Sequence, residues 1–322
     1  MHTLDTRPAL RDGRQGVLPD SVRPYRVRWR YAVVIGVVHA LACLVLLPGF
    51  FSWTGVVACV LGVPLFGAGI NLGYHRLLTH RSFCTPKWVE YALASLAVCS
   101  LEDTPVQWVA VHRMHHAHSD DVPDPHSPLV TFLWSHLGWL LMVNPGIDTL
   151  AFRDRFAPDL LRDRFYFNLE KYGYLQVAIA LAQVPVFFIL GLVAGCLTGG
   201  LEEGVRLGAS VVVWGVFLRI VLVWHITWSV NSLSHVFGYR NYDTDDGSRN
   251  NWLVALLAFG EGWHNNHHAD PTAASVQHRW WEIDISYYEI KLLEVLGLAR
   301  DIVKPRHQRA RTVGGEGCPK HG

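Results

Sequence analysis

Histidines gather in three short clusters of this 322-residue sequence, and they are the residues best suited to carry chemistry. The clusters hold eight of the 18 histidines and read His75-Arg-Leu-Leu-Thr-His80, His112-Arg-Met-His115-His116 and His264-Asn-Asn-His267-His268. A lone histidine usually serves as a hydrogen-bonding residue. Packing eight titratable rings together is costly unless a metal holds them neutral. The clusters therefore predict a metal site.

Two of the clusters have helical spacing. Residues i, i+3 and i+4 lie on one face of a helix, so the three histidines of each His-x-x-His-His cluster should point the same way. His75 and His80 are five residues apart, and on a regular helix their side chains diverge by well over a right angle. These two histidines require a helix end or two different metals.

The number of imidazoles exceeds the needs of one ion, so we expect two. Imidazole suits Zn, Cu, Fe and Ni, and ligand type alone does not choose among them. The sequence has no His-Glu-x-x-His motif of the kind that zinc hydrolases use. Two redox metals beside a membrane suggest dioxygen chemistry on a lipid chain, and iron is the metal we expect.

Four apolar segments are long enough to cross a membrane, which takes about 20 residues. They cover about residues 31–47, 53–73, 175–197 and 205–224, and a shorter apolar patch at 88–101 suggests an interfacial or partly buried helix. Only 17% of the residues are charged and the net charge is +1, so electrostatics imply no nucleic-acid partner. We predict an all-α membrane protein with four transmembrane helices and a cytosolic helical cap that holds a His-rich site for two metals.

Lysine and arginine indicate which side of the membrane each segment occupies. Seven arginines precede the first span, whereas the connectors at 48–52 and 198–204 contain no Lys or Arg. We therefore expect both termini and the long middle segment to be cytosolic, so that all three clusters meet on one side. This divides the chain into an Arg-rich cytosolic tail (1–30), one membrane domain (31–305) and a flexible C-terminal tail (306–322).

The motifs resemble those of the membrane fatty-acid desaturases, in particular the Δ9 stearoyl-type branch. That branch pairs an HxxxxH box with two HxxHH boxes, as in HRLLTH, HRMHH and HNNHH here, and flanking stretches such as SDDVPDPHSP and NSLSHVFG are also similar. The resemblance covers about residues 30–305. It implies a four-span, mushroom-like helical fold and a cytosolic diiron centre with nine ligands: His75, His80, His112, His115, His116, His235, His264, His267 and His268. It also implies that Asn231 reaches one iron (Fe2+) through water.

The same resemblance implies a reaction: O2-dependent insertion of a cis double bond at Δ9 of a saturated acyl chain. Electrons would come from an external donor of the ferredoxin or cytochrome b5 type, because the sequence lacks a haem motif and a ferredoxin cysteine set. The stretch 108–111 before the second box is uncharged and is similar to plant and cyanobacterial members, some of which act on acyl groups already in lipids. We expect acyl-CoA as the substrate, with an acyl-lipid as the alternative.

Several further residues are expected near the centre. Five of them are predicted to contact substrate, although surface polarity or an interfacial aromatic belt would also explain them: Trp108, Asp246, Arg249, Asn250 and Trp263. Three aspartates after the second box are expected to orient imidazoles rather than to bind metal: Asp120, Asp121 and Asp124.

Two other functions remain open at this point. The same centre could hydroxylate the chain, or desaturate it at another carbon. A metal transporter would place histidines inside the spans, where only His39 clearly lies. We expect an integral protein of a bacterial inner membrane, or of the endoplasmic reticulum in a eukaryotic host.

Overall fold

The computed structural model describes residues 22–120, 124–128 and 130–309. Within these ranges the regular elements are helices, and extended pairing is limited to isolated bridges. In chain order the elements are α1 (Trp29–Ala42), η2 (Cys43–Leu46), η3 (Pro48–Phe50), α2 (Trp53–Ala68), η4 (Gly69–Thr79), α3 (Lys87–Val98), α4 (Pro105–His118), η5 (Trp134–Gly138), α5 (Trp139–Leu141), α6 (Leu150–Phe156), α7 (Pro158–Arg162), α8 (Arg164–Lys171), α9 (Gly173–Val212), η6 (Val213–Leu218), α10 (Arg219–Val236), α11 (Trp252–Leu257), α12 (His264–Ala269), α13 (Ile285–Val295) and η7 (Arg306–Gln308). Most of the two expected tails, residues 1–21 and 310–322, lies outside the described part.

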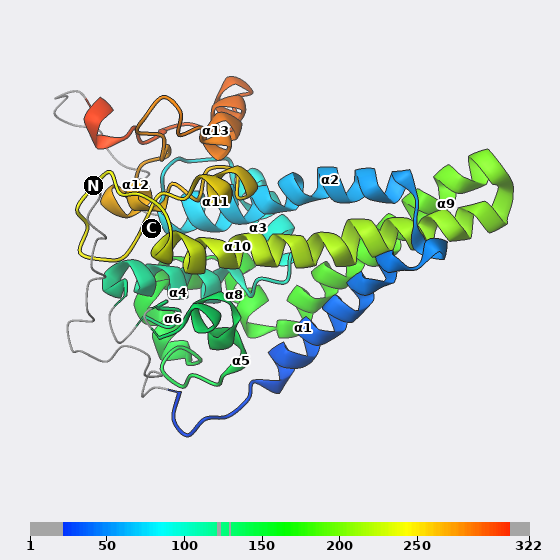
Figure 1. Ribbon diagram of the computed structural model, residues 1–322, viewed down its shortest axis with the longest axis horizontal. Coiled ribbons are helices and arrows are strands. Elements are labelled where there is room, and N and C mark those ends of the chain that lie inside the picture. Colours follow the sequence, from blue (N-terminus) through cyan, green and yellow to red (C-terminus); the bar gives the residue numbers. More distant parts are fainter. Residues whose placement is uncertain (1–21, 121–123, 129, 310–322) are drawn as a thin grey trace, which may run out of the picture.

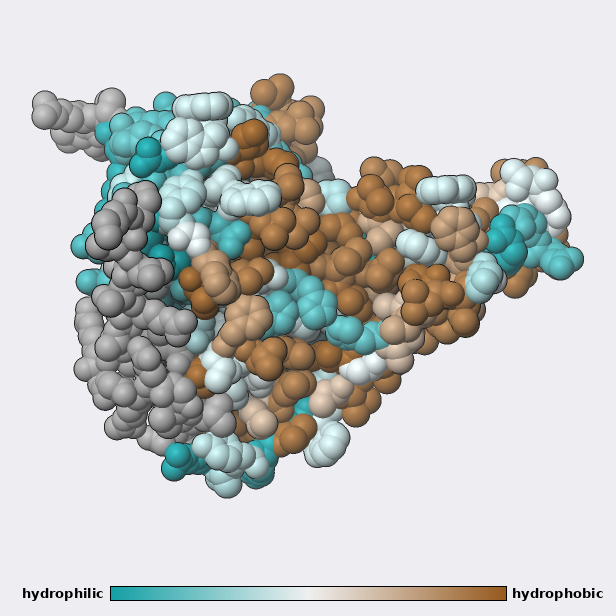
Figure 2. Space-filling view, in the orientation of Figure 1, coloured by the Kyte–Doolittle hydropathy of each residue, from teal (hydrophilic) through white to brown (hydrophobic). Residues whose placement is uncertain are grey.

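Three continuous helical segments are long and apolar enough to cross a membrane: Trp29–Leu46, Trp53–Thr79 and Gly173–Val236. They form a bundle that projects from a broader helical cap, by which we mean the rest of the described chain (Figure 1). The bundle presents hydrophobic side chains to the outside, whereas the cap carries most of the hydrophilic surface in this view (Figure 2). Such a distribution suits a protein whose bundle lies in lipid and whose cap lies in water.

The third segment folds back on itself, so that its two arms run side by side. Gly200 interrupts the helix with φ +80°, a conformation that glycine adopts without a steric penalty. A Cβ on Gly195 would lie 2.6 Å from the Cα of Gly204, so the two backbones approach too closely for larger side chains. The expected spans at 175–197 and 205–224 are the two arms of this hairpin.

Arg219 lies inside the bundle and is fully buried. Its guanidinium donates to the backbone oxygens of Gly215 and Cys99 and to the side-chain oxygen of Gln183, and it lies 3.8 Å from the ring centre of Phe66. These contacts give the intramembrane charge a structural role, holding three helices together.

The cap surrounds the end of the bundle where the first histidine cluster lies (Figure 1). Helix α3 packs closely against η4, because Gly69 and Gly73 leave room for the backbone of Leu93 and Ala97. A buried apolar cluster then joins η4 and α3 to α4, α6 and α8. These contacts place the first two histidine clusters beside each other.

Candidate metal centre

The structure brings the nine expected histidines together in two adjacent groups. Within each group, one ring nitrogen from every histidine lies within 4.8 Å of the others. The first group contains His75, His80, His112, His116 and His267, and the second contains His115, His235, His264 and His268. They come from the ends of two bundle segments and from the cap, and most of them are buried.

Each His-x-x-His-His cluster contributes to both groups. Helix α4 gives His112 and His116 to the first group and His115 to the second. Helix α12 does the reverse, with its i and i+4 histidines in the second group and His267 in the first. The three histidines of a cluster do share one side of their helix, as their spacing predicted, but they are divided between two centres.

A π-helix brings together His75 and His80 of the first cluster, although they are five residues apart. The segment η4 has π-helical hydrogen bonding, and the amide of His80 donates to the carbonyl of His75, five residues earlier. Such i→i+5 bonding brings residues five apart onto the same side. The two rings consequently lie with centroids 4.8 Å apart, in the same group. His80 is the C-cap of η4, so the helix end that the spacing requires is present, and the two histidines lie in one group rather than in two.

His235 completes the second group from the last turn of α10. It belongs to no histidine cluster, so spacing alone does not identify it. Its Nε2 lies 3.1 Å from Nε2 of His264, and its Nδ1 donates to Asp120 at 3.1 Å. Topology brings it there, because α10 is the last part of the second arm of the hairpin, which returns the chain to the cap (Figure 1).

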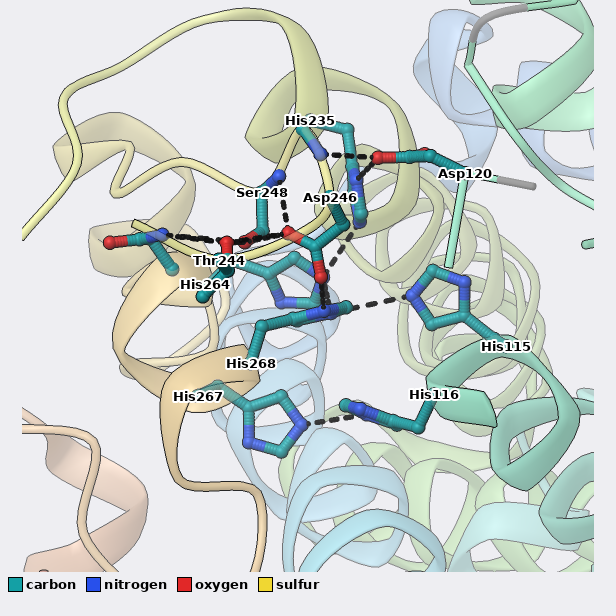
Figure 3. Close-up of polar contacts among 12 residues, drawn as sticks. His115, His116, Asp120, His235, Thr244, Asp246, Ser248, His264, His267 and His268 are labelled. Atoms are coloured by element: carbon teal, nitrogen blue, oxygen red, sulfur yellow. Dashed lines mark hydrogen bonds and ion pairs between the residues drawn. The ribbon is translucent and has the colours of Figure 1, made fainter. Parts of the chain in front are cut away.

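Carboxylates lie behind four of the imidazoles, and Figure 3 shows two of these pairs, His235–Asp120 and His268–Asp246. Nδ1 of His115 donates to Asp124 at 2.9 Å, and Nδ1 of His268 donates to Asp246 at 2.6 Å. The pairs His235–Asp120 and His75–Glu261 have nitrogen–oxygen distances of 3.1 and 2.9 Å. A carboxylate on Nδ1 fixes the tautomer and leaves the Nε2 lone pair directed into the centre.

Asp120 and Asp124 thus lie where the sequence predicted imidazole-orienting carboxylates, whereas Asp121 is outside the described residues. Glu261 was not anticipated. It comes three residues before the third cluster, and it binds both His75 and the buried Arg76, which also pairs with Asp284 at 2.8 Å. Only the three-dimensional approach of η4 to this segment reveals that role.

The electrostatics favour neutral rings at His112, His264 and His267 and ionised carboxylates at Glu261 and Asp124. Burial, together with neighbouring imidazoles, lowers the pKa of His112, His264 and His267 well below the usual value. Burial alone would raise the pKa of Glu261, but Arg76 and His75 lower it to about 2. Against the same effect of burial, His115 holds the pKa of Asp124 well below its usual range. Neutral imidazole is the form that binds metal.

The ring nitrogens converge as the ligands of metal ions do. Nε2 of His267 lies 3.1 Å from that of His75 and 3.0 Å from that of His116, and the His264–His235 distance is 3.1 Å. Two nitrogens bound at right angles to an ion about 2.1 Å away lie about 3.0 Å apart. The two groups therefore fit two metal ions.

A buried ring nitrogen without a partner supports the same conclusion. Nε2 of His80 has no hydrogen-bond partner within the described residues. Such a group is costly to bury unless a ligand meets it. Imidazole nitrogens backed by carboxylates are a donor set that iron and zinc both accept.

A cavity of about 590 Å³ reaches the centre. Three of the nine expected ligands line it, namely His75, His112 and His264, and so do His126 and Asn231. Apolar side chains, including Ile70 and Trp224, form other parts of its wall. This volume is in the range of pockets that enclose small-molecule ligands.

Trp108 is one of the five residues predicted to contact substrate, and it lines this cavity. Its ring stacks on His112 with centroids 4.9 Å apart, and its Nε1 donates to Glu102 at 3.3 Å. Asp246 instead holds His268, as described above. Trp108 is therefore part of the cavity wall, whereas Asp246 belongs to the candidate metal centre.

The other three predicted substrate contacts lie outside the cavity wall. Asn250 is buried and donates to the side chain of Asn266 at 2.9 Å. Trp263 is also buried, and its Nε1 donates to the backbone of Ile283. Arg249 reaches the carbonyl of Gly238 at 3.4 Å. In this conformation these side chains stabilise the loop and helix that carry the third cluster.

Residues 51–291 match the model of the family described as fatty acid desaturase. The chain belongs to the fatty acid desaturase family. It is thus an oxidoreductase, and its paired histidine groups form the candidate metal centre of a desaturase.

Similar relatives come from cyanobacteria, and they are matched over almost their whole length. The chain is 43% identical to an sn-2 palmitoyl-lipid 9-desaturase of Nostoc sp., over 91% of this chain and 96% of the relative. It is 43% identical to an sn-1 stearoyl-lipid 9-desaturase of Anabaena variabilis, over 88% and 96%. The sn-1 stearoyl-lipid 9-desaturase of Synechocystis sp. is 41% identical, over 89% and 84%.

Proposed function

We propose that this desaturase inserts a cis double bond at Δ9 of a saturated acyl chain esterified in a membrane lipid. The observation that carries the proposal is that nine imidazoles, in groups of five and four, lie beside a partly apolar cavity, and that three of them form part of its wall. The overall change converts two adjacent CH2 groups, O2, two electrons and two protons into CH=CH and two water molecules. Two iron ions bound by the histidines would supply the activation of O2.

For the acyl carrier, we propose the second of the two candidates that the sequence leaves open. The sequence predicts acyl-CoA first, with an acyl-lipid as the alternative. The three cyanobacterial relatives described above, each at least 41% identical, are named for palmitoyl-lipid or stearoyl-lipid substrates. These names favour the lipid-bound chain, which we therefore propose for this desaturase.

The chain's own residues would prepare the centre. The carboxylates on His75, His115, His235 and His268 hold their Nδ1 protons and so keep Nε2 free for metal. These four carboxylates also provide four negative charges, equal to the positive charge of two divalent ions. Trp108, fixed by His112 on one side and Glu102 on the other, gives the acyl chain a rigid surface next to the first group.

The location and electron source complete the proposal. With its two arms counted separately, the bundle supplies four spans, and the even number keeps the three histidine clusters on the cytosolic side with both termini. The membrane would be a bacterial inner membrane. A separate ferredoxin or cytochrome b5-type protein would deliver electrons at the cap.

Expression in a desaturase-deficient bacterium tests the reaction. The fatty acids would be analysed by gas chromatography and mass spectrometry after double-bond derivatisation. Wild type should produce Δ9-monounsaturated chains, His264→Ala should produce none, and His307→Ala, an exposed histidine outside both groups, should match wild type. Hydroxylated chains or double bonds at another carbon would contradict the Δ9 assignment.

Purified protein in vesicles tests the carrier. One preparation would contain 1-stearoyl phosphatidylglycerol, and the other stearoyl-CoA with fully unsaturated lipid; both would receive ferredoxin, its reductase and NADPH. We expect oleoyl phospholipid in the first and little product in the second. Rapid conversion of stearoyl-CoA with no conversion of the phospholipid would overturn the lipid assignment.

A further inference from the structure

The cavity reaches the surface of the molecule between two helices of the bundle. Its exposed lining residues are at the start of α1, namely Arg30 and Val34, and at the start of α9, namely Gly173 and Val177. Val34 is 44% exposed and Val177 is 50% exposed. In Figure 1, α1 diverges from the other long helices toward its Trp29 end. The opening therefore lies at the side of the bundle, in the first turns of two apolar segments.

The position of this opening relative to the lipid headgroups determines which molecules can enter it. Helices α1 and α9 each begin a segment that is apolar enough to cross a membrane. Their first turns would lie where the headgroup layer meets the hydrocarbon core. A chain that enters here comes from lipid rather than from water.

One arginine at the rim of the opening has no acidic partner within the described residues. Arg153 is paired with Glu170 at 3.1 Å, and Arg28, next to the rim, is paired with Asp148 at 2.5 Å. Arg30 makes no ion pair within the described residues, and its side chain is exposed at the cavity edge. An arginine in this position is free to bind an anionic or strongly polar headgroup.

The cavity wall beside this rim contains apolar side chains. Val34 and Ile35 on one side and Val177 on the other line the entrance, and Trp224 and Trp228 line the wall further along the bundle. Such walls suit methylene groups, whereas the charged rim suits ester and phosphate groups. A polar rim next to apolar walls suits a glycerolipid whose headgroup stays at the membrane surface.

We infer that the α1–α9 opening is a lateral entrance for lipid-bound acyl chains, and that Arg30 binds the headgroup phosphate while the chain slides between the helices. This inference rests on the proposed function and specifies how its substrate reaches the centre. The lipid keeps its headgroup in the interfacial layer throughout. A CoA ester has a large, charged headgroup in water and would need to approach from the cap side.

Photo-cross-linking tests the entrance without depending on turnover. The probe is phosphatidylglycerol with a diazirine on a carbon close to the acyl ester, incorporated into phosphatidylglycerol vesicles with the purified holoenzyme. After irradiation, we expect labelled peptides from residues 30–35 and 173–177. Labelling confined to the outer surface of the cap, or spread evenly over the bundle, would overturn the inference.

Blocking variants test whether the labelled route is the productive one. Val177→Trp should reduce both labelling and desaturation of vesicle lipid, because the indole fills the entrance. Val186→Trp is the matched control on the same helix: it is also exposed, lies outside the cavity lining, and should match wild type. Full lipid desaturation by Val177→Trp would overturn the inference and leave the proposed function intact. A wild type without activity on any acyl lipid would overturn the proposed function, whatever the labelling pattern.

The role of Arg30 is tested separately. Arg30→Gln should raise the half-saturating fraction of phosphatidylglycerol about fivefold, the effect of one basic residue at an anionic membrane surface, with kcat unchanged. Arg30→Lys should restore most of the affinity. Equal affinity in Arg30→Gln and wild type, or a loss confined to kcat, would remove Arg30 from the entrance.

Discussion

At the scale of single residues, the metal-binding capacity of the histidines depends on the acidic side chains behind them. Asp246 lies 2.6 Å from Nδ1 of His268 and holds that ring in the tautomer with a free Nε2. Asp246→Asn would keep the shape but remove the charge, so we expect the affinity for iron to fall about 10–100-fold. Competition with a chelator measures this affinity. Asp243→Asn, at a fully exposed side chain, is the control and should retain wild-type affinity.

A second residue-scale prediction concerns Glu102 in the cavity wall. Burial raises the pKa of Glu102 to about 8, although hydrogen bonds from Thr227 and Trp108 act in the opposite direction. The carboxyl is therefore neutral at pH 7 and becomes charged as the pH rises through 8. A charged group in the wall opposes entry of an apolar chain, so the KM for lipid should rise above pH 8.

Glu102→Gln separates this effect from general loss of activity at alkaline pH. The amide has nearly the same size and stays neutral, so its KM should be constant across the range where the wild-type KM rises. The same pKa shift makes the folded protein bind more protons than the unfolded chain between the ordinary value of 4.5 and about 8. Wild-type stability should therefore decline as the pH rises over this interval, and Glu102→Gln should remove that part of the decline.

The residue types and spacings of the clusters were sufficient to predict a two-metal site, and the acidic stretch after the second cluster was sufficient to predict orienting carboxylates. Glu261 escaped prediction because its partner His75 is distant in sequence. The same holds for Asp246, which the sequence analysis placed near substrate, whereas in the structure it contacts His268. Side-chain roles that depend on contacts between distant segments have no local sequence signal.

At the scale of elements, hydropathy predicted the helical segments well, but the backbone hydrogen-bonding pattern could not be predicted. The apolar runs and the fold-back between 197 and 205 follow from composition and from glycines. The π-helical bonding of η4 does not, because an apolar periodicity cannot distinguish i→i+4 from i→i+5 bonding over so short a segment. That detail decides whether His75 and His80 serve one metal or two.

The hairpin of α9 gives an element-scale prediction. Gly191, Gly195, Gly204 and Gly208 let its arms touch through their backbones. Gly195→Leu should lower the free energy of unfolding by about 1–3 kcal/mol, as overpacking does elsewhere, and lower the Tm in detergent. Gly36→Leu is the control, because nothing lies within 4 Å of the position of its Cβ. A Tm equal to that of wild type in Gly195→Leu would contradict close packing of the arms.

At the scale of the whole molecule, the arrangement of the bundle and cap predicts the topology. The fold-back around Gly200 lies at the end of the bundle remote from the cap (Figure 1). In a bacterial host, alkaline phosphatase inserted after Glu202 should be active, because it would be exported. Green fluorescent protein fused after Arg309 should fluoresce, because it would remain in the cytosol. An inactive phosphatase after Glu202, or a non-fluorescent fusion after Arg309, would refute the proposed orientation.

The division of each His-x-x-His-His cluster between two groups has a mechanical consequence. Two ions bound in this way would tie together η4, α4, α10 and α12, four segments separated by long stretches of chain, and neither ion could leave without loosening both α4 and α12. Metal would then hold the C-terminal part of the cap in place, and its binding free energy would stabilise the folded state. A cell short of iron would lose the protein as well as its activity, because proteases would cleave a cap that unfolds locally without metal.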